Sequence, residues 1–144
     1  MVPGREPAGV KLTPDGVLEI RAGVHSHGQG METTLAQIAN QILGLEINAI
    51  RVTLGDTGTT PYSTGTWGSR SIVMAGSAVG QACKILRSRL LKIAAWILKE
   101  DLSTVQWKDH AAVGMNGSVD LSELAKIWYL KPQLLPSDVD PQGL

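Results

Sequence analysis

A glutamine between two glycines, Gly28-Gln29-Gly30, stands immediately before a predicted helix. The first turn of a helix has amide N–H groups without intrahelical partners, and the positive end of the helix dipole strengthens their attraction for anions. Glycine lets a bulky group approach the main chain, and the glutamine amide can donate and accept hydrogen bonds at the edge of a heterocycle. The loop therefore predicts a site for a phosphate or a nucleotide. Taken alone, a tight turn with Gln29 in solvent explains the same residues.

A second polar segment runs from Gly55 to Ser69, fifteen residues rich in Gly, Thr, Ser, Asp and Pro and without periodicity. Compact domains seldom keep such a stretch without a functional reason. It leads through Gly68-Ser69-Arg70-Ser71 into a long predicted helix, and hydroxyl groups, an arginine and helix-start amides all suit pyrophosphate. The simpler alternatives are a helix N-cap at Ser69 or Ser71 and a surface ion pair at Arg70.

The remaining candidates for chemistry have weaker patterns. His25, His27 and His110 are not spaced as a metal site with cysteines or carboxylates, and we expect them to be structural or exposed to solvent. Asp56, which precedes a threonine, is typical of an Asx turn. Cys83 is the single cysteine and lies in an apolar helical pattern, so we expect it in the core. It cannot form an internal disulfide, which suits a reducing compartment.

Composition narrows the class of protein. With 144 residues the chain is long enough for one hydrophobic core, and its 13 basic and 13 acidic side chains give no overall attraction to nucleic acid or to an anionic membrane. The segment from Met1 to Lys11 has prolines and charges where a signal peptide needs an apolar run. Ser71 to Leu98 is the most apolar region, but its four basic residues are too many for a membrane span. We therefore expect a cytoplasmic protein.

The elements that position the two motifs follow from periodicity. Apolar–polar alternation predicts strands at Val17–Val24 and Ala49–Leu54. Apolar residues at helical spacing predict a helix at Glu32–Leu43 that ends at Gly44. Strand, helix and strand in this order are typical of a crossover unit, which assigns the chain to the α/β (α+β) class.

The second half is predicted to contain a long helix, a small strand pair and a short C-terminal helix. The long helix covers Ser71–Lys99 and contains two glycines one turn apart, Gly76 and Gly80. Because glycine costs helix stability, we expect another element to pack closely there. The remaining predicted elements are strands at 104–108 and 111–115, a turn at Asn116-Gly117, and a helix at 121–129 with Asp120 as its N-cap.

These elements define three segments of the chain. Residues 1–13 are expected to be irregular, residues 14–130 to form the domain, and residues 131–144 to form an extended tail punctuated by prolines. Trp67 is expected to pack under its loop, with a position on the cofactor or substrate side as the alternative. Three tryptophans that lie in helix or strand patterns are expected in the core: Trp96, Trp107 and Trp128.

Taken together, the loop at 28–30, the segment 55–62 and the segment 65–71 form an ordered set of motifs. This set resembles the molybdenum-cofactor-binding (large) subunit of the molybdenum hydroxylases, the family of xanthine dehydrogenase, aldehyde oxidoreductase and aerobic carbon monoxide dehydrogenase. The resemblance runs from about Pro14 to about Leu130, and residues 28–76 carry nearly all of its specificity.

The resemblance implies contacts to molybdopterin dinucleotide, usually the cytosine form in bacteria, whose molybdenum is held by the pterin dithiolene. It implies no catalytic residue and no metal ligand in this chain. Two positions differ from the pattern of many members, which have aspartate at Gly58 and often histidine at Met31. The implied cofactor-binding residues are Gly28, Gln29, Gly30, Met31, Thr33, Thr34, Gln37, Gly68, Ser69, Arg70 and Ser71.

The resemblance also implies that the chain is one part of an oxidoreductase. The family oxidises its substrates at molybdenum with the help of a glutamate base near the C-terminus of a much longer subunit, and this chain has no counterpart of that glutamate. We therefore expect a truncated form, a split-gene product or a remnant, incomplete for catalysis alone. The implied partners are the remaining part of the molybdenum subunit, an iron–sulfur subunit and a flavin subunit with FAD. Exposed apolar surface is expected where the missing part docks, and would favour a homo-oligomer.

Two other classes of function stay open. A non-catalytic remnant, serving as an assembly or nucleotide-binding module, would keep the scaffold after losing the active half. An unrelated α/β protein could bind a simple nucleotide through the glycine loop, although the chain has neither a Gly-x-Gly-x-x-Gly pattern nor a phosphate loop with lysine. Purines, aldehydes, N-heterocycles and carbon monoxide all remain possible substrates, because the residues that select among them lie elsewhere.

Overall fold

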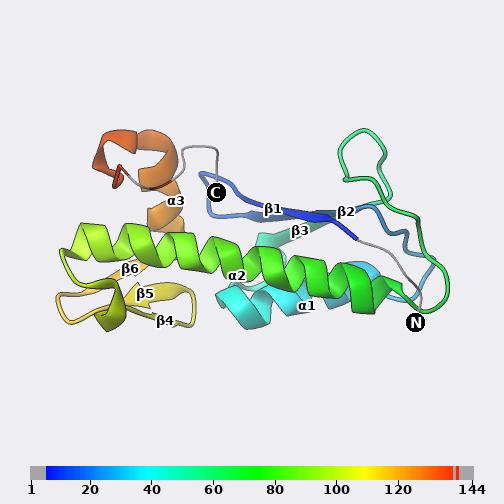
Figure 1. Ribbon diagram of the computed structural model, residues 1–144, viewed down its shortest axis with the longest axis horizontal. Helices are drawn as coiled ribbons and strands as arrows, with labels where there is room; N and C mark the ends of the chain where they lie inside the picture. The colour runs from blue at the N-terminus through cyan, green and yellow to red at the C-terminus, as the bar shows by residue number, and fades with distance from the viewer. Residues whose placement is uncertain (1–5, 138, 140–144) are drawn as a thin grey trace.

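A computed structural model describes residues 6–137 and residue 139. Its longest element is helix α2 (Ser71–Leu98), which runs the length of the molecule between two small sheets (Figure 1). Helix α2 contacts strand β1, helices α1 and α3, and all three strands of the second sheet. The predicted combination of mixed α/β structure with one long helix is confirmed.

The first sheet contains three strands in the order β1 (Ala8–Leu12), β2 (Leu18–Ala22) and β3 (Ile50–Leu54). Strand β1 pairs antiparallel with β2, and β2 pairs parallel with β3 through the crossover helix α1 (Met31–Leu43). The apolar alternation of the central strand β2 places one face of the strand in the core: Leu18, Ile20 and Ala22 are fully buried, while the residues between them are not.

Helices α1 and α2 pack side by side and begin at the same end of the molecule (Figure 1). The contact is close because Gly76 and Gly80 of α2 face α1. A Cβ atom added to Gly76 would lie 3.0 Å from Cδ1 of Ile38, and one added to Gly80 would lie 3.7 Å from Cγ2 of the same side chain. The close packing predicted from the two glycines is confirmed.

The far end of α1 is joined to the second sheet. Gly44 ends the helix in the left-handed conformation, with φ 75°, and its N–H donates to the Asn40 carbonyl at 2.7 Å. The indole N–H of Trp107 donates to the Leu43 carbonyl at 3.2 Å, and the Arg87 guanidinium donates to the Ile42 carbonyl at 3.3 Å. The last carbonyl groups of α1 are therefore satisfied by the neighbouring helix and sheet.

The second sheet has three short antiparallel strands where the sequence predicted a pair. They are β4 (Gln106–Lys108), β5 (Ala111–Val113) and β6 (Ser118–Asp120), followed by helix α3 (Leu121–Leu130). Strand β6 was missed because three residues are too few to show an alternating pattern. Asp120 caps α3 as predicted, since its carboxylate accepts from the Glu123 N–H at 2.7 Å.

Two predictions about the chain ends need correction. Residues 8–12 of the segment expected to be irregular form β1, whose regular structure depends on pairing with β2. In the tail, Pro132–Leu134 form a 3₁₀ turn in place of extended chain. Residues 1–5, 138 and 140–144 lie outside the described part of the chain. Short 3₁₀ turns also occur at Ile47–Ala49 and Leu102–Thr104.

The core contains most of the residues predicted for it. Cys83 is fully buried, and burial raises the pKa of its thiol to about 12. Trp128 is buried and Trp107 is half-buried. Trp96, by contrast, is 59% exposed, so its assignment to the core was wrong. Periodicity alone does not tell which apolar residues of the long helix are covered by other elements.

The C-terminus of α1 gives a direct test of close packing. Gly44 and Gly30 both have φ 75°, but a Cβ atom at Gly44 would lie 2.0 Å from the Asp109 carbonyl oxygen, whereas one at Gly30 meets nothing within 4 Å. Gly30→Ala should therefore lower the free energy of unfolding by about 1 kcal/mol through backbone strain alone. Gly44→Ala should lower it by about 3 kcal/mol, because strain and overpacking add. Equal losses in urea denaturation would show that the contact with Asp109 relaxes freely.

The cap of α3 should be pH-dependent. The Glu123 N–H bonded to Asp120 lowers the pKa of that carboxyl, so the ionised cap stabilises the fold above the ordinary value of 3.8 and the effect is lost as the pH falls through the lower folded-state value. Asp120→Asn keeps a capping oxygen without the charge and should lower the free energy of unfolding by about 0.5 kcal/mol at pH 7. In denaturation from pH 7 to pH 2 the difference should shrink to zero. A difference that is constant with pH would contradict a role for the charge.

Candidate functional site

A cleft of about 540 Å³ opens at the end of the molecule where α1 and α2 begin. It brings together the two motifs that the sequence singled out, although they lie far apart along the chain. Six of the predicted cofactor-binding residues line it: Gln29, Met31, Thr34, Gly68, Ser69 and Ser71. Four further lining residues were not predicted as ligands: His27, Thr66, Trp67 and Ile72.

Both helices begin without a side-chain cap. The residue before α1 is Gly30, in the left-handed conformation, and the residue before α2 is Arg70; neither makes a capping hydrogen bond through a side chain. Because the two starts lie at one cleft, two sets of first-turn amides and the positive ends of two helix dipoles act on the same volume. The arrangement favours an anion with more than one charge.

Glu32 shows the electrostatic character of this end of α1. Its exposed carboxylate accepts a hydrogen bond from its own backbone N–H in the first helical turn and one from the Ser26 hydroxyl. These bonds, with a smaller contribution from His25, lower the pKa of the carboxyl. The protein's own anion is therefore stabilised at the helix start, as the dipole requires.

The turn into α2 has an unusual backbone. Gly68 and Ser69 both have positive φ, 57° and 56°. Serine rarely adopts the left-handed conformation, which costs on the order of 1 kcal/mol and is held only when the surroundings determine it. The turn brings the hydroxyl-bearing Ser69 and the first residue of α2, Ser71, to the cleft.

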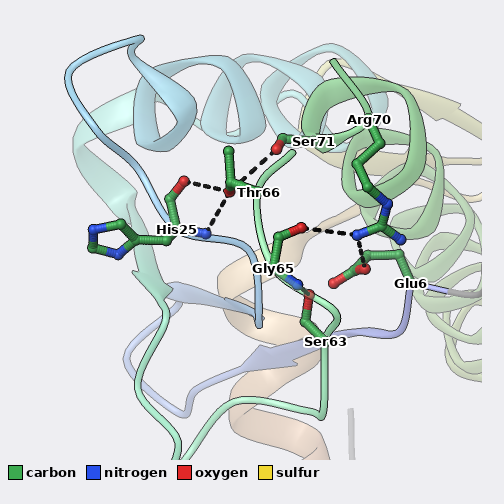
Figure 2. Close-up of polar contacts among 7 residues, drawn as sticks. All are labelled: Glu6, His25, Ser63, Gly65, Thr66, Arg70 and Ser71. Carbon is green, nitrogen blue, oxygen red and sulfur yellow. Dashed lines mark hydrogen bonds and ion pairs between the residues drawn. The ribbon is translucent and has the colours of Figure 1, made fainter. Parts of the chain in front are cut away.

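Thr66 joins the two loops of the cleft (Figure 2). Its hydroxyl donates to the His25 carbonyl at 2.6 Å and accepts from the His25 N–H at 2.9 Å. The Ser71 hydroxyl donates to the same oxygen at 3.2 Å. One side chain therefore connects the loop before α1, the loop before α2 and the first residue of α2.

Gln29 also fixes its own loop. Its side-chain oxygen accepts from the His27 N–H at 2.6 Å, and its side-chain nitrogen donates to the His25 carbonyl at 3.4 Å. The amide is thus partly used within the loop and lines the cleft at the same time. These two hydrogen bonds hold the Gln29 side chain in place, whereas the alternative interpretation left it without protein contacts in solvent.

Comparisons with known proteins agree with this geometry. A family model described as a molybdopterin cofactor-binding domain matches residues 1–140. The chain belongs to this family. It is 33% identical over 139 residues to the nicotine 6-hydroxylase large subunit of Paenarthrobacter nicotinovorans, covering 94% of this chain and 17% of that protein. It is 38% identical over 99 residues to the carbon monoxide dehydrogenase large chain of Hydrogenophaga pseudoflava, covering 69% of this chain and 12% of that protein.

Solved structures extend the likeness to the fold of nearly the whole chain. The carbon monoxide dehydrogenase of Oligotropha carboxidovorans matches 97% of this chain with a TM-score of 0.89 and 33% identity, over 17% of that chain. Quinoline 2-oxidoreductase of Pseudomonas putida 86 matches 94% with a TM-score of 0.84 and 26% identity, over 18% of that chain. The resemblance to the molybdenum subunits of the molybdenum hydroxylases is confirmed, and the chain spans less than a fifth of the length of these relatives.

Arg70 occupies a different place from the one expected. Its guanidinium does not line the cleft of the molybdopterin-binding domain; it is buried, pairs with the Glu6 carboxylate at 2.9 Å and donates to the Gly65 carbonyl at 2.9 Å (Figure 2). Its side chain therefore contacts protein groups, contrary to the expectation that it would face pyrophosphate. Nothing in the local sequence indicated Glu6, because the pair depends on how the chain folds.

The other predicted residues fall into two groups. Gly28, Gly30, Thr33 and Gln37 do not line the cleft, and their contacts to cofactor remain predictions. Asp56 forms the expected Asx turn: its carboxylate accepts from the Gly58 N–H and the Thr59 hydroxyl, both at 2.9 Å, and these bonds lower the pKa of the carboxyl.

Trp67 is 49% exposed and lines the cleft, so packing under the loop was the wrong expectation and the alternative position is the one observed. Thr66 was missed because only the folded chain places a threonine of one loop against the backbone of another.

Among the residues that the structure describes, three or more His, Cys, Asp or Glu side chains nowhere gather as metal ligands would. No helix in the described part of the chain is both long and apolar enough to cross a lipid bilayer.

The link through Thr66 can be tested by an isosteric change. Thr66→Val removes three hydrogen bonds without changing shape and should lower the free energy of unfolding by about 1 kcal/mol, a modest loss because the loop is exposed and water can replace the bonds. Thr66→Ser keeps the hydroxyl and serves as the control. If the valine variant is as stable as the serine variant in urea denaturation, the two loops are held together by other contacts.

Proposed function

We propose that this chain is a part of the molybdenum subunit of a molybdenum hydroxylase and binds molybdopterin cytosine dinucleotide at the starts of α1 and α2. The observation that carries the proposal is the meeting of two helix starts, both without side-chain caps, at one cleft. A dinucleotide has a pyrophosphate at its centre, the group that helix-start amides are best suited to bind.

The residues present fit such a group. The cleft of about 540 Å³ is larger than a phosphate needs, and its lining combines hydroxyl groups with apolar surface from Met31, Trp67 and Ile72. A Cβ atom built at Gly28 or Gly30 would meet nothing within 4 Å, so the main chain before α1 is open to close approach. Polar groups for phosphate and flat or apolar groups for a ring system are both available.

The chain's own contribution is to bind and orient the cofactor. The first-turn amides of α1 and α2, with the Ser69 hydroxyl, would hold the pyrophosphate, and Gln29 would contact a heterocycle edge. When bound, the cofactor supplies two-electron redox chemistry at molybdenum. No residue of this chain is assigned a catalytic role, so we propose that the base and the substrate-selecting residues belong to the rest of the subunit.

The remaining part of the molybdenum subunit is proposed because the chain covers a small share of its relatives, and the other partners are proposed from the family resemblance. These other partners are an iron–sulfur subunit and a flavin subunit with FAD, in the cytoplasm. One relative from Paenarthrobacter nicotinovorans is named a dehydrogenase complex subunit gamma and is 34% identical over 141 residues. Large exposed apolar side chains support docking of further protein or self-association: Ile85, Trp96, Leu102, Met115 and Leu130.

The alternative is a non-catalytic remnant that serves as an assembly or nucleotide-binding module. Both proposals need the same cleft, and they differ in whether molybdenum and partner chains accompany it. The chain should therefore be isolated from its native host with whatever copurifies. Molybdenum by mass spectrometry, together with cytidine monophosphate released by acid and partner chains, is the result we expect. A folded chain that carries no molybdenum and no cytidine monophosphate and that recruits no partner would favour the non-catalytic remnant.

A charge placed at the cleft separates ligand binding from fold stability. Ile72 lies in the first turn of α2 and lines the cleft. Ile72→Asp should stabilise the fold by about 0.5 kcal/mol relative to the isosteric Ile72→Asn, because a carboxylate suits a helix start. The same carboxylate should weaken binding of cytidine 5′-diphosphate about tenfold relative to Ile72→Asn, because it repels the pyrophosphate.

Calorimetry for binding and urea denaturation for stability provide the two measurements. Equal affinity of the aspartate and asparagine variants would mean that the diphosphate does not bind at the start of α2. Comparing these two variants cancels the loss of the apolar side chain, which both share.

A further inference from the structure

The ion pair beneath the cleft is unusual because it is completely buried. Arg70 Nη1 lies 2.9 Å from the Glu6 carboxylate, and the two side chains are 1% and 0% exposed. Removing two charges from water is costly, and within the described part of the chain Oε1 of Glu6 and both Nε and Nη2 of Arg70 are buried without hydrogen-bond partners. Such a pair is a poor source of stability, because apolar residues of similar size would serve as well or better.

Arg70 instead holds the wall of the cleft at several points. Its guanidinium donates to the Gly65 carbonyl at 2.9 Å, and its central carbon lies 5.7 Å from the centroid of the Trp67 ring. Its backbone N–H donates to the Trp67 carbonyl at 3.2 Å. Arg70 at the end of the segment 65–70 therefore contacts Gly65 at its start and Trp67 in its middle. The segment contains the lining residues Thr66 to Ser69. The position of the wall therefore depends on the position of one guanidinium.

Glu6 fixes that guanidinium from outside the cleft. It precedes β1, which is paired with β2, and it does not line the cleft. Without the carboxylate, the buried cation would have the Gly65 carbonyl as its one hydrogen-bond acceptor among residues 6–137 and 139, and would tend to turn toward water. The segment before β1 is thus connected to the start of α2 through two side chains (Figure 2).

We propose that Glu6 and Arg70 are positioning residues of the cofactor cleft: the buried pair sets the conformation of segment 65–70 and so the affinity of the cleft for a pyrophosphate-containing nucleotide. The second half of this statement rests on the proposed function, and the first half does not. The pair acts through Thr66, Trp67 and the start of α2, and neither charged side chain touches the ligand.

Three variants of the full chain test the proposal. Glu6→Gln removes one charge and keeps the shape. The double variant Glu6→Leu with Arg70→Met replaces the pair by apolar groups and should fold with a melting temperature near that of the wild type. Glu19→Gln is the matched control, because Glu19 forms a partly exposed ion pair with Arg21 at 3.0 Å and does not line the cleft.

Two measurements are made on each variant. Amide hydrogen exchange by NMR follows the N–H groups of His25 and Arg70, which bond to the Thr66 hydroxyl and the Trp67 carbonyl, with the N–H of Thr34 at the start of α1 as reference. Calorimetry follows the affinity for cytidine 5′-diphosphate. In both Glu6→Gln and the double variant, exchange at His25 and Arg70 should rise about tenfold relative to Thr34, and affinity should fall about tenfold. Glu19→Gln should change neither.

The double variant decides between positioning and stability. If it regains wild-type exchange and affinity together with its melting temperature, the pair is a structural element only and the proposal is overturned. Unchanged exchange in a folded Glu6→Gln variant overturns it as well. If the wild-type chain does not bind the diphosphate while exchange rises as expected, the ligand in the proposed function is wrong and the positioning of the segment stands. If Glu6→Gln does not fold, the double variant supplies the answer.

Discussion

The close packing of α1 on α2 is the constraint on which the rest of the structure depends. Gly76 and Gly80 allow the Ile38 side chain to lie against the backbone of α2, and the parallel crossover from β2 to β3 gives α1 its direction. The two helices consequently begin together (Figure 1). Side-by-side helices with the same direction repel one another through their dipoles, and this repulsion is greatest at their ends. An anion at the shared start relieves it, so the packing that builds the fold also prepares the site.

The polar side chains around the cleft act mainly on the protein's own backbone. Thr66 and Gln29 bond to main-chain groups of the loop before α1, and Arg70 bonds to the loop before α2. Apart from the Glu32 N–H, which bonds to its own carboxylate, the first-turn N–H groups at the helix starts are left for a ligand. Recognition through main-chain groups held by side chains loses little conformational entropy on binding, since the groups that make the contacts are already fixed.

Local patterns in the sequence predicted the elements whose causes are local. The helical period of α1 and α2, the glycine at the end of α1 and the aspartate cap of α3 all act within a few residues, and each was predicted correctly. Strand β1 was missed because its Ala-Gly-Val-Lys-Leu sequence lacks clear alternation and becomes a strand only beside β2. The exposure of Trp96 was missed because periodicity does not say which apolar face of a long helix is covered.

The site divides in the same way. The glycine–glutamine loop and the start of α2 were predicted as parts of one site because family motifs carry them in order, and six of the eleven expected ligands line the cleft. The buried partner of Arg70 could not be predicted, since Glu6 and Arg70 are brought together only by the completed first sheet. A charged residue in a polar loop gives no local sign that its side chain will be buried.

The sharing of α2 between both sheets has a consequence for how this domain can evolve. The second sheet looks separable, yet Trp107 bonds to the end of α1 and Tyr129 of α3 bonds to the Leu12 carbonyl at the end of β1. Deleting or exchanging the second sheet as a module would expose one side of α2 and remove a contact that holds the C-terminal end of α1. The N-terminal end of the same helix forms part of the cleft.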